Sequence, residues 1–281
     1  MRSLVANGDR VEAVSSERDF LRLLPEATHA MVWKFKAEWF KKAGKLRVLS
    51  TPAAGKELLP ESAPAGVTMH FGGFHGKIIA ESVVGFMLAW AHGFFAIERH
   101  KPHWARSWLS DKCYSLAGTK AVIVGFGRIG HAIKKTLDGF GVETEGFTRK
   151  NIGELPKAAK EADWFILALP SNSGTDNLLD AKKLSWLPKR CVVINVGRGN
   201  SIDEAALLAA LKGHKIAGAY LDVCKGESSE IWQGHRRGRN EGGIDPNKTA
   251  LPNLVLMPHS SAFSPRYVRE MFTELANEGL I

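Results

Sequence analysis

In the second half of the chain, apolar and polar positions form a regular pattern. After Lys120, apolar runs alternate with segments of helical period. The runs predict six strands: Ala121–Val124, Glu143–Phe147, Trp164–Leu169, Cys191–Val196, Ile216–Asp222 and Leu254–Met257. Five of them are mostly apolar and rich in β-branched residues, as parallel strands covered on both faces are, and only the second is more polar. This half therefore predicts a doubly wound parallel sheet of the Rossmann type.

The first part of the chain has shorter alternating segments. Helical patterns at Glu17–Leu24 and Ala37–Ala43 alternate with strand patterns at Ala27–Trp33, Leu46–Ser50 and Val67–Phe71. Short βα units of this kind predict a second, smaller parallel sheet.

A long helix is expected between the two parts, over about Ile78–His100. Its apolar side chains go around much of the circumference: Phe86, Met87, Trp90, Phe94 and Phe95. We expect some of this surface to meet a second copy of the chain in a homodimer. The alternative is burial between the two domains of one chain.

The first strand of the second part runs directly into a glycine turn, Gly125-Phe126-Gly127-Arg128-Ile129-Gly130, which opens a helix. Gly125 suits a tight turn, Gly127 lets the backbone approach a pyrophosphate, and Gly130 allows close packing of helix on strand. The helix N-terminus adds N–H donors and a positive dipole end. A dinucleotide site is expected here, and an ordinary glycine turn is the alternative.

The composition of the chain excludes only a few classes of function. The 281 residues are 44% hydrophobic and carry a net charge of +9, which suits either an anionic ligand or a basic surface kept for solubility. The short run Arg236–Arg239 indicates a solvated loop, so no nucleic-acid partner is expected. Three widely spaced cysteines indicate neither disulfides nor a metal site, and we expect Cys191 and Cys224 to be buried thiols. No signal peptide or bilayer-spanning segment is indicated, so we expect a cytoplasmic protein.

The cofactor choice is indicated by the residues after the second strand. In NAD-binding sheets an acid about twenty residues beyond the glycine turn bonds the ribose. Thr148, Arg149 and Lys150 occupy that place, and none is acidic. A hydroxyl with two cations suits the extra phosphate of NADP, so we expect NADP, with NAD as the alternative. The alternative interpretation of these three residues is a basic turn that is solvated and binds no cofactor.

Four more strand ends carry chemistry. They are followed by Leu169–Thr175, Asn195–Asn200, Asp222–Glu227 and Pro258–Ser261. Ligands bind at the carboxyl ends of strands in open α/β sheets, so an Arg, an Asp, a Glu and a His would gather there. Each alone has a structural explanation, but together beside a dinucleotide they indicate hydride transfer coupled to proton transfer.

These motifs resemble the D-isomer-specific 2-hydroxyacid dehydrogenase family, and in particular its glyoxylate/hydroxypyruvate reductases. The resemblance covers nearly the whole chain: the glycine turn, Leu169-Pro170 with Thr175, Ile194–Gly199, Ile202–Leu207 with its Asp203-Glu204 pair, Gly218–Val223 and Pro258-His259.

The resemblance implies roles for individual residues. Arg198 would bind the carboxylate and carbonyl oxygen of a 2-oxo acid, His259 would be the general acid/base, and Glu227 would hold its imidazole. Asp222 would bond the nicotinamide carboxamide. Further cofactor contacts are implied for Arg128, Ile129, Leu169, Pro170, Thr175, Val196, Gly197 and His259. Substrate contacts are implied in the smaller domain for Ala54, Gly55 and His75, although a plain loop histidine is an equal interpretation of His75.

By the same resemblance, residues 1–90 and 263–281 would form a flavodoxin-like substrate domain, and residues 91–262 the dinucleotide-binding domain. Family members commonly have Pro after the catalytic Glu and a shorter path to the His. Here Ser228 follows Glu227 and the extra length lies near Arg236–Gly243, which leaves Glu230 as an alternative partner. Both ends are short for the family, so we expect a trimmed small domain, which lacks its first strand, or a shortened chain.

The sequence thus predicts an NADP-preferring reductase of a small 2-oxo acid such as glyoxylate or hydroxypyruvate. Three alternatives stay open: a phosphoglycerate dehydrogenase-like enzyme that uses NAD, a nucleotide-sensing corepressor-like binding protein, and a catalytically weak remnant of the family.

Overall fold

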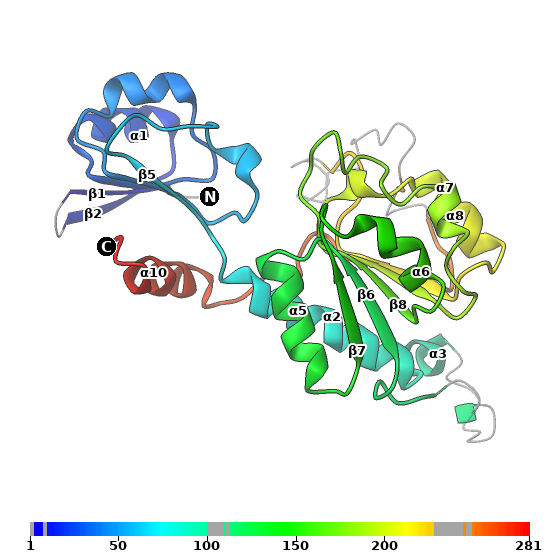
Figure 1. Ribbon diagram of the computed structural model, residues 1–281. Helices are drawn as coiled ribbons and strands as arrows, with labels where there is room; N and C mark the ends of the chain where they lie inside the picture. The colour runs from blue at the N-terminus through cyan, green and yellow to red at the C-terminus, as the bar shows by residue number, and fades with distance from the viewer. Residues whose placement is uncertain (1–2, 8–9, 100–108, 111–112, 228–243, 246–248) are drawn as a thin grey trace. The chain divides into compact units, whose positions relative to one another are not determined.

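The computed structural model describes residues 3–7, 10–99, 109–110, 113–227, 244–245 and 249–281 (Figure 1). The chain divides into two compact units, Met1–His75 with Ser264–Ile281 and Gly76–Phe263, which we call the first and second unit. The first stretch of the first unit ends at His75, whereas we expected the smaller domain to extend to residue 90. The physical reason is that the helix after His75 packs its apolar face on the sheet of the second unit.

The second unit is built on six parallel strands: β6 (Lys120–Val124), β7 (Glu143–Phe147), β8 (Trp164–Leu167), β9 (Val192–Asn195), β10 (Gly218–Leu221) and β11 (Leu254–Leu256). Their order is β11-β10-β9-β8-β6-β7. The chain leaves β6 in one direction to β7 and returns to β8 on its other side, which creates the switch point where such sheets bind ligands. The predicted doubly wound fold is confirmed.

Helices cover both faces of this sheet, as Figure 1 shows. Alternate side chains of a strand point to opposite faces, so Val122 and Val124 join one core while Ala121 and Ile123 join the other. The first core takes α6 (Leu155–Ala159), α7 (Ala181–Leu184) and α8 (Glu204–Lys212), and the second takes α2 (His75–Ala91) and α5 (Arg128–Asp138). β7 alternates in burial because it is the edge strand, which explains its polar sequence.

The predicted long helix is interrupted. α2 ends at Ala91 and α3 (Phe94–Arg99) follows, because Gly93 adopts a φ of +70° that a right-handed helix cannot continue. Phe86 is buried and stacks on Tyr220 with ring centroids 4.7 Å apart, so the sheet covers much of the apolar surface. Phe94 stays 61% exposed, and a contact with a second subunit remains a prediction. No helix among the described residues is both long and apolar enough to cross a membrane.

The first unit contains a five-stranded sheet: β1 (Ser3–Asn7), β2 (Arg10–Val14), β3 (His29–Met31), β4 (Val48–Thr51) and β5 (Thr68–Phe71). The order β2-β1-β3-β4-β5 is flavodoxin-like. The expectation of a wholly parallel sheet is wrong for β1, which pairs antiparallel with both β2 and β3. Only two residues separate β1 from β2, too few for the crossover that parallel strands require. We expected this sheet to lack its first strand and to expose an edge there, but β1 and β2 lie beside β3 at that edge.

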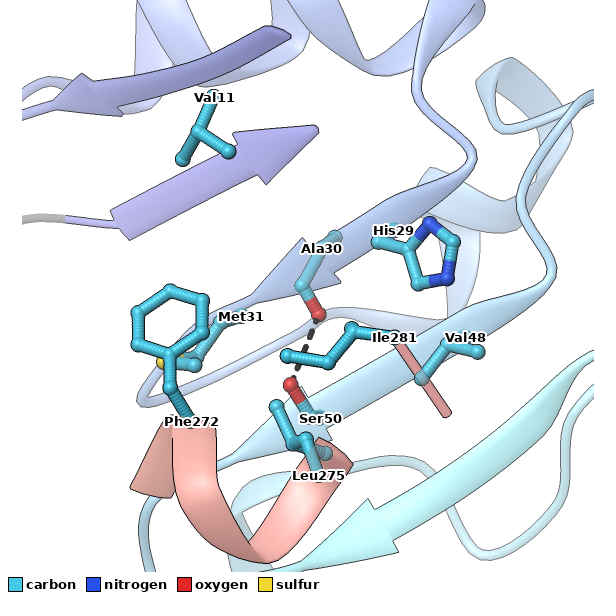
Figure 2. Close-up of a pocket in the computed structure, with 9 residues that line it drawn as sticks. All are labelled: Val11, His29, Ala30, Met31, Val48, Ser50, Phe272, Leu275 and Ile281. Carbon is cyan, nitrogen blue, oxygen red and sulfur yellow. Dashed lines mark hydrogen bonds between the residues drawn. The ribbon is translucent and has the colours of Figure 1, made fainter. Parts of the chain in front are cut away.

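Opposite faces of this smaller sheet are covered by different segments. Phe20 of α1 (Glu17–Leu23) and Trp39 of the 3-10 helix η2 (Ala37–Lys42) pack with Leu49 on one face. Two further single-turn 3-10 helices, η1 (Leu24–Glu26) and η3 (Lys56–Leu58), lie in the connections of this unit. On the other face, α10 (Tyr267–Asn277) contributes Phe272 and Leu275 to an apolar cavity of about 40 Å³, which Figure 2 shows against β3 and β4.

Candidate functional site

The turns that follow β6 and β8 lie against each other at the switch point of the second unit. Gly125 has a φ of +100°, and a Cβ there would lie 2.4 Å from the carbonyl oxygen of Ala168. A Cβ on Gly130 would lie 2.5 Å from the carbonyl oxygen of Gly125. Both predicted roles, the tight turn and the close helix packing, are thus confirmed by the backbone geometry.

The third glycine of the motif faces open space. Gly127 is the N-cap of α5, and an added Cβ there would meet no atom within 4 Å. A glycine N-cap supplies no side-chain oxygen to the first-turn N–H groups of α5. Arg128 and Ile129 open that first turn. The turn therefore fits a dinucleotide pyrophosphate, which would approach a bare backbone at the positive end of a helix.

The turn after β7 is exposed and basic. Thr148, Arg149 and Lys150 are all solvent-exposed. Asn151 shapes the turn, since its Oδ1 accepts from the Thr148 N–H at 2.7 Å and its Nδ2 donates to the carbonyl oxygen of Gly146. The Thr148 hydroxyl also accepts from the Lys150 N–H at 3.3 Å. Two cations are thus presented on a braced turn, as the expected contact with a 2′-phosphate requires.

A buried threonine braces the turn after β8. The Thr175 hydroxyl lies 2.7 Å from the carbonyl oxygen of Pro170 and accepts from the Asn172 N–H at 3.0 Å. Thr175 is 6% exposed, so this side chain orders the turn from within. Its predicted cofactor contact, and those of Leu169 and Pro170, stay predictions.

The turn after β9 carries Arg198. Buried Asn195 closes it: Oδ1 accepts from the Gly197 N–H at 3.1 Å and Nδ2 donates to the carbonyl oxygen of Arg198 at 3.0 Å. A Cβ on Gly199 would overlap the backbone of Cys224, so the Arg198 turn is packed directly on the turn after β10. Val196, which precedes the turn, is itself buried.

Asp222 fixes the turn after β11. Its Oδ1 accepts from the N–H groups of Ser260 and Ser261 at 2.9 and 3.0 Å, and its backbone oxygen accepts from the His259 N–H at 2.8 Å. Asp222 is 3% exposed. Besides its expected contact with the nicotinamide, which remains a prediction, this carboxylate holds the segment that bears His259.

A carboxylate faces the imidazole at this edge. Glu227 Oε2 lies 2.8 Å from His259 Nδ1, and Oε1 accepts from the Cys224 N–H. His259 is held at a φ of +52°, a region that few non-glycine residues adopt. The structure therefore pairs Glu227 with His259, and the alternative partner Glu230 lies outside the described residues.

The first unit places His75 in an aromatic cluster. Its Nε2 lies 2.7 Å from the Tyr267 hydroxyl, and its ring stacks on Phe74 at 4.0 Å between centroids. Trp33 stacks on Tyr267 in turn. Burial lowers the pKa of His75 to about 4 and raises that of the Tyr267 phenol, so both groups are neutral at neutral pH.

The lowered pKa of His75 predicts acid-sensitive stability. In the unfolded chain a histidine binds its proton near pH 6.5, whereas folded His75 binds it only near pH 4. The stabilisation is complete above pH 6.5 and is lost as the pH falls toward 4, by about 2–3 kcal/mol at pH 4.5. His75→Gln keeps a partner for Tyr267 without a titrating group. Its free energy of unfolding should fall less between pH 7 and 4.5 than that of the wild type, and an equal fall in both proteins would contradict the prediction.

The structure brings together four of the predicted residues within the second unit. Arg198, Asp222, Glu227 and His259 lie on adjacent strand-end turns of the second unit. In the first unit, exposed Ala54 and buried Gly55 follow β4, and His75 follows β5. The substrate contacts of all three residues stay predictions.

No role was predicted from the sequence for Asn195, Glu204 or Tyr267. Glu204 offered a signal, because it shares a helix face with Leu207 and Leu211, where an acid is out of place. The expected burial of Cys191 and Cys224 is confirmed.

Comparisons with known proteins agree with the fold described above. The family described as "D-isomer specific 2-hydroxyacid dehydrogenase, NAD binding domain" matches residues 84–261. Glycerate dehydrogenase of Methylorubrum extorquens is 26% identical over 88% of this chain and 80% of its own length. Glyoxylate reductase of Pyrococcus furiosus is 32% identical over 63% of this chain and 51% of its own length. The solved NADPH-dependent glyoxylate/hydroxypyruvate reductase of Sinorhizobium meliloti, in complex with NADP and malonate, superposes with a TM-score of 0.63 at 25% identity, covering 90% of this chain and 79% of that one.

Proposed function

Because the chain belongs to the D-isomer specific 2-hydroxyacid dehydrogenase family, whose members use NAD(P), we propose that it reduces a small 2-oxo acid with NADPH. The observation that carries the proposal is the Glu227–His259 pair, 2.8 Å apart, on strand-end turns adjacent to the Arg198 turn. The glycine turn at the switch point of the same sheet fits the dinucleotide.

Arg198 and His259 have different roles in the proposed reaction: Arg198 stabilises negative charge, and His259 transfers a proton. The bound nicotinamide would supply the hydride that reduces the carbonyl carbon. The Arg198 guanidinium suits the substrate carboxylate and carbonyl oxygen, because its planar fork matches two oxygens and stabilises the negative charge that develops on one of them. Glu227 faces Nδ1 of His259, so proton transfer to the carbonyl oxygen falls to Nε2.

Glyoxylate and hydroxypyruvate are the substrates we favour. The Pyrococcus relative is a glyoxylate reductase, and the Sinorhizobium enzyme is a glyoxylate/hydroxypyruvate reductase solved with malonate, a small dicarboxylate. In this chain the loop after β4 offers the small residues Ala54 and Gly55, whose backbone N–H groups suit a substrate carboxylate.

NADPH should be preferred over NADH by about tenfold or more in kcat/KM, because each charge-assisted hydrogen bond to the 2′-phosphate contributes about 1.5–3 kcal/mol. Thr148→Asp places a carboxylate beside Arg149 and should reverse the preference. Initial rates with both cofactors at saturating acid measure the ratio. Glu143→Asp, an exposed acid at the opposite end of β7, is the matched control. A wild type that uses NADH faster than NADPH would overturn the assignment of NADP.

One assay tests the proposed function itself. The protein is mixed with NADPH and a panel of 2-oxo acids, with 3-phosphohydroxypyruvate included, and the absorbance of the reduced nicotinamide is followed. We expect the fastest loss with glyoxylate or hydroxypyruvate. A dominant rate with the phosphorylated acid would favour a phosphoglycerate dehydrogenase-like enzyme, and cofactor binding without turnover would favour a sensing role.

A further inference from the structure

Glu204 is a buried carboxylate at a position where the helix does not need one. It is the first residue of α8 and is 3% exposed, on the same buried face as Leu207 and Leu211. Asp203 already caps this helix, because its Oδ1 accepts from the Ala206 N–H at 3.0 Å. A buried carboxylate is costly unless it is hydrogen-bonded, so the partners of Glu204 indicate what it does.

Both carboxylate oxygens accept from backbone N–H groups outside the helix. Oε1 accepts from Lys225 at 2.6 Å and Oε2 accepts from Ile244. Ile244 is fully buried. Burial raises the pKa of Glu204, and the two N–H donors act in the opposite direction by favouring the carboxylate. One side chain therefore joins the segment after β10 to the segment that leads toward β11.

The Lys225 segment is the one that orients the imidazole. Cys224, just before it, donates its N–H to Glu227 Oε1, and Gly226 turns the chain with a φ of +74°. Glu227 Oε2 then faces His259 Nδ1. Hydrogen bonds thus run from Glu204 through a single short turn to the acid/base pair.

We propose that Glu204 is a positioning residue of the reaction: its two oxygens clamp the Lys225 and Ile244 segments so that Glu227 stays in register with His259. The clamp also accounts for how this chain accommodates the unusual length between Glu227 and His259, since Lys225 and Ile244 lie on either side of the added residues. The assignment rests on the proposed function only in naming the reaction that the clamp serves.

The test is Glu204→Gln, which keeps the shape but presents an amide donor to one of the two N–H groups. We expect kcat for 2-oxo acid reduction to fall by about 10- to 100-fold with little change in KM for NADPH, because misplacing a catalytic group by about 1 Å costs this much. The pH–rate profile should also differ from that of the wild type, because Glu227 no longer holds the ring in place.

The matched control is Asp163→Asn. Asp163 also accepts a backbone N–H, from Lys120 at 2.8 Å, but at the amino end of the strands, away from the site. This control should lower Tm without moving the pH profile. If Glu204→Gln lowers Tm in the same way and leaves kcat and the pH profile unchanged, the carboxylate is merely structural and the proposal is wrong.

A second readout does not require turnover. The imidazole Hε1 signal of His259, followed by NMR from pH 5 to 9, gives its titration midpoint in the wild type, Glu204→Gln and Glu227→Gln. We expect both variants to move the midpoint in the same direction, and a midpoint that moves in Glu227→Gln alone overturns the clamp. A wild type with no activity on any 2-oxo acid would defeat the proposed function while this titration still decides the role of Glu204. If Glu204→Gln does not fold, Glu204→Asp, too short to reach both N–H groups, takes its place in both measurements.

Discussion

Replacing His259 by Asn should lower kcat/KM for 2-oxo acid reduction by about 10²- to 10⁴-fold, the usual contribution of a positioned general acid. Asn is the informative substitution because His259 is held at a φ of +52°, in the left-handed region that Asn tolerates better than other non-glycine residues. An alanine there would add backbone strain to the loss of the proton donor. Initial rates, with NADPH affinity measured separately by fluorescence, separate chemistry from binding.

Two outcomes decide this prediction. An unchanged Kd for NADPH and an unchanged Tm, together with the loss of rate, would place the effect in proton transfer. A rate within about twofold of the wild type would show that another group donates the proton, and the role of His259 would be wrong. His214→Asn is the matched control, because His214 also has a positive φ, of +49°, but lies after α8 and away from the strand ends that carry the site.

Replacing Arg198 by Gln should cost about 10²- to 10³-fold in kcat/KM, with KM for the acid rising and KM for NADPH little changed. The guanidinium is expected to bind the substrate carboxylate and to stabilise charge on the carbonyl oxygen, and removing one preorganised donor costs this much in comparable sites. Arg198→Lys keeps the charge but loses the planar fork, so it should recover only part of the activity.

The control for the loss of a cation is Arg190→Gln. Arg190 pairs with Asp163 through a 2.6 Å contact at the other end of the strands and is largely exposed. Its loss should leave KM for the acid unchanged. Should Arg198→Gln keep the wild-type KM and kcat, the substrate carboxylate must be bound elsewhere.

Much of the second unit could be predicted from the sequence for a physical reason. Strands buried on both faces need continuous apolar runs, and β6, β8, β9 and β10 have them. The residues of the site follow these runs directly, so their position at one edge of the sheet could be predicted from the sequence. Local side-chain chemistry also determines the start of α8, because an Asp before a helical segment is a common N-cap and Asp203 caps this helix.

Features that depend on pairing between distant segments could not be predicted. Whether β1 pairs parallel or antiparallel depends on its partner and connection, not on its own composition. The contact between His75 and Tyr267 joins residues far apart in the sequence, which no local pattern can pair. Likewise, the sequence left the choice between Glu227 and Glu230 open, because only the fold of the turn after β10 brings Glu227 to His259.

Our central proposal is that this site reduces a small 2-oxo acid with NADPH as the hydride donor. The most direct test mixes the wild-type protein with NADPH and hydroxypyruvate or glyoxylate and measures both the loss of reduced nicotinamide and the hydroxy acid formed. We predict equal amounts of the two, with no loss of reduced nicotinamide when the acid is left out. Tight binding of NADPH with no hydroxy acid formed from either substrate would contradict the account.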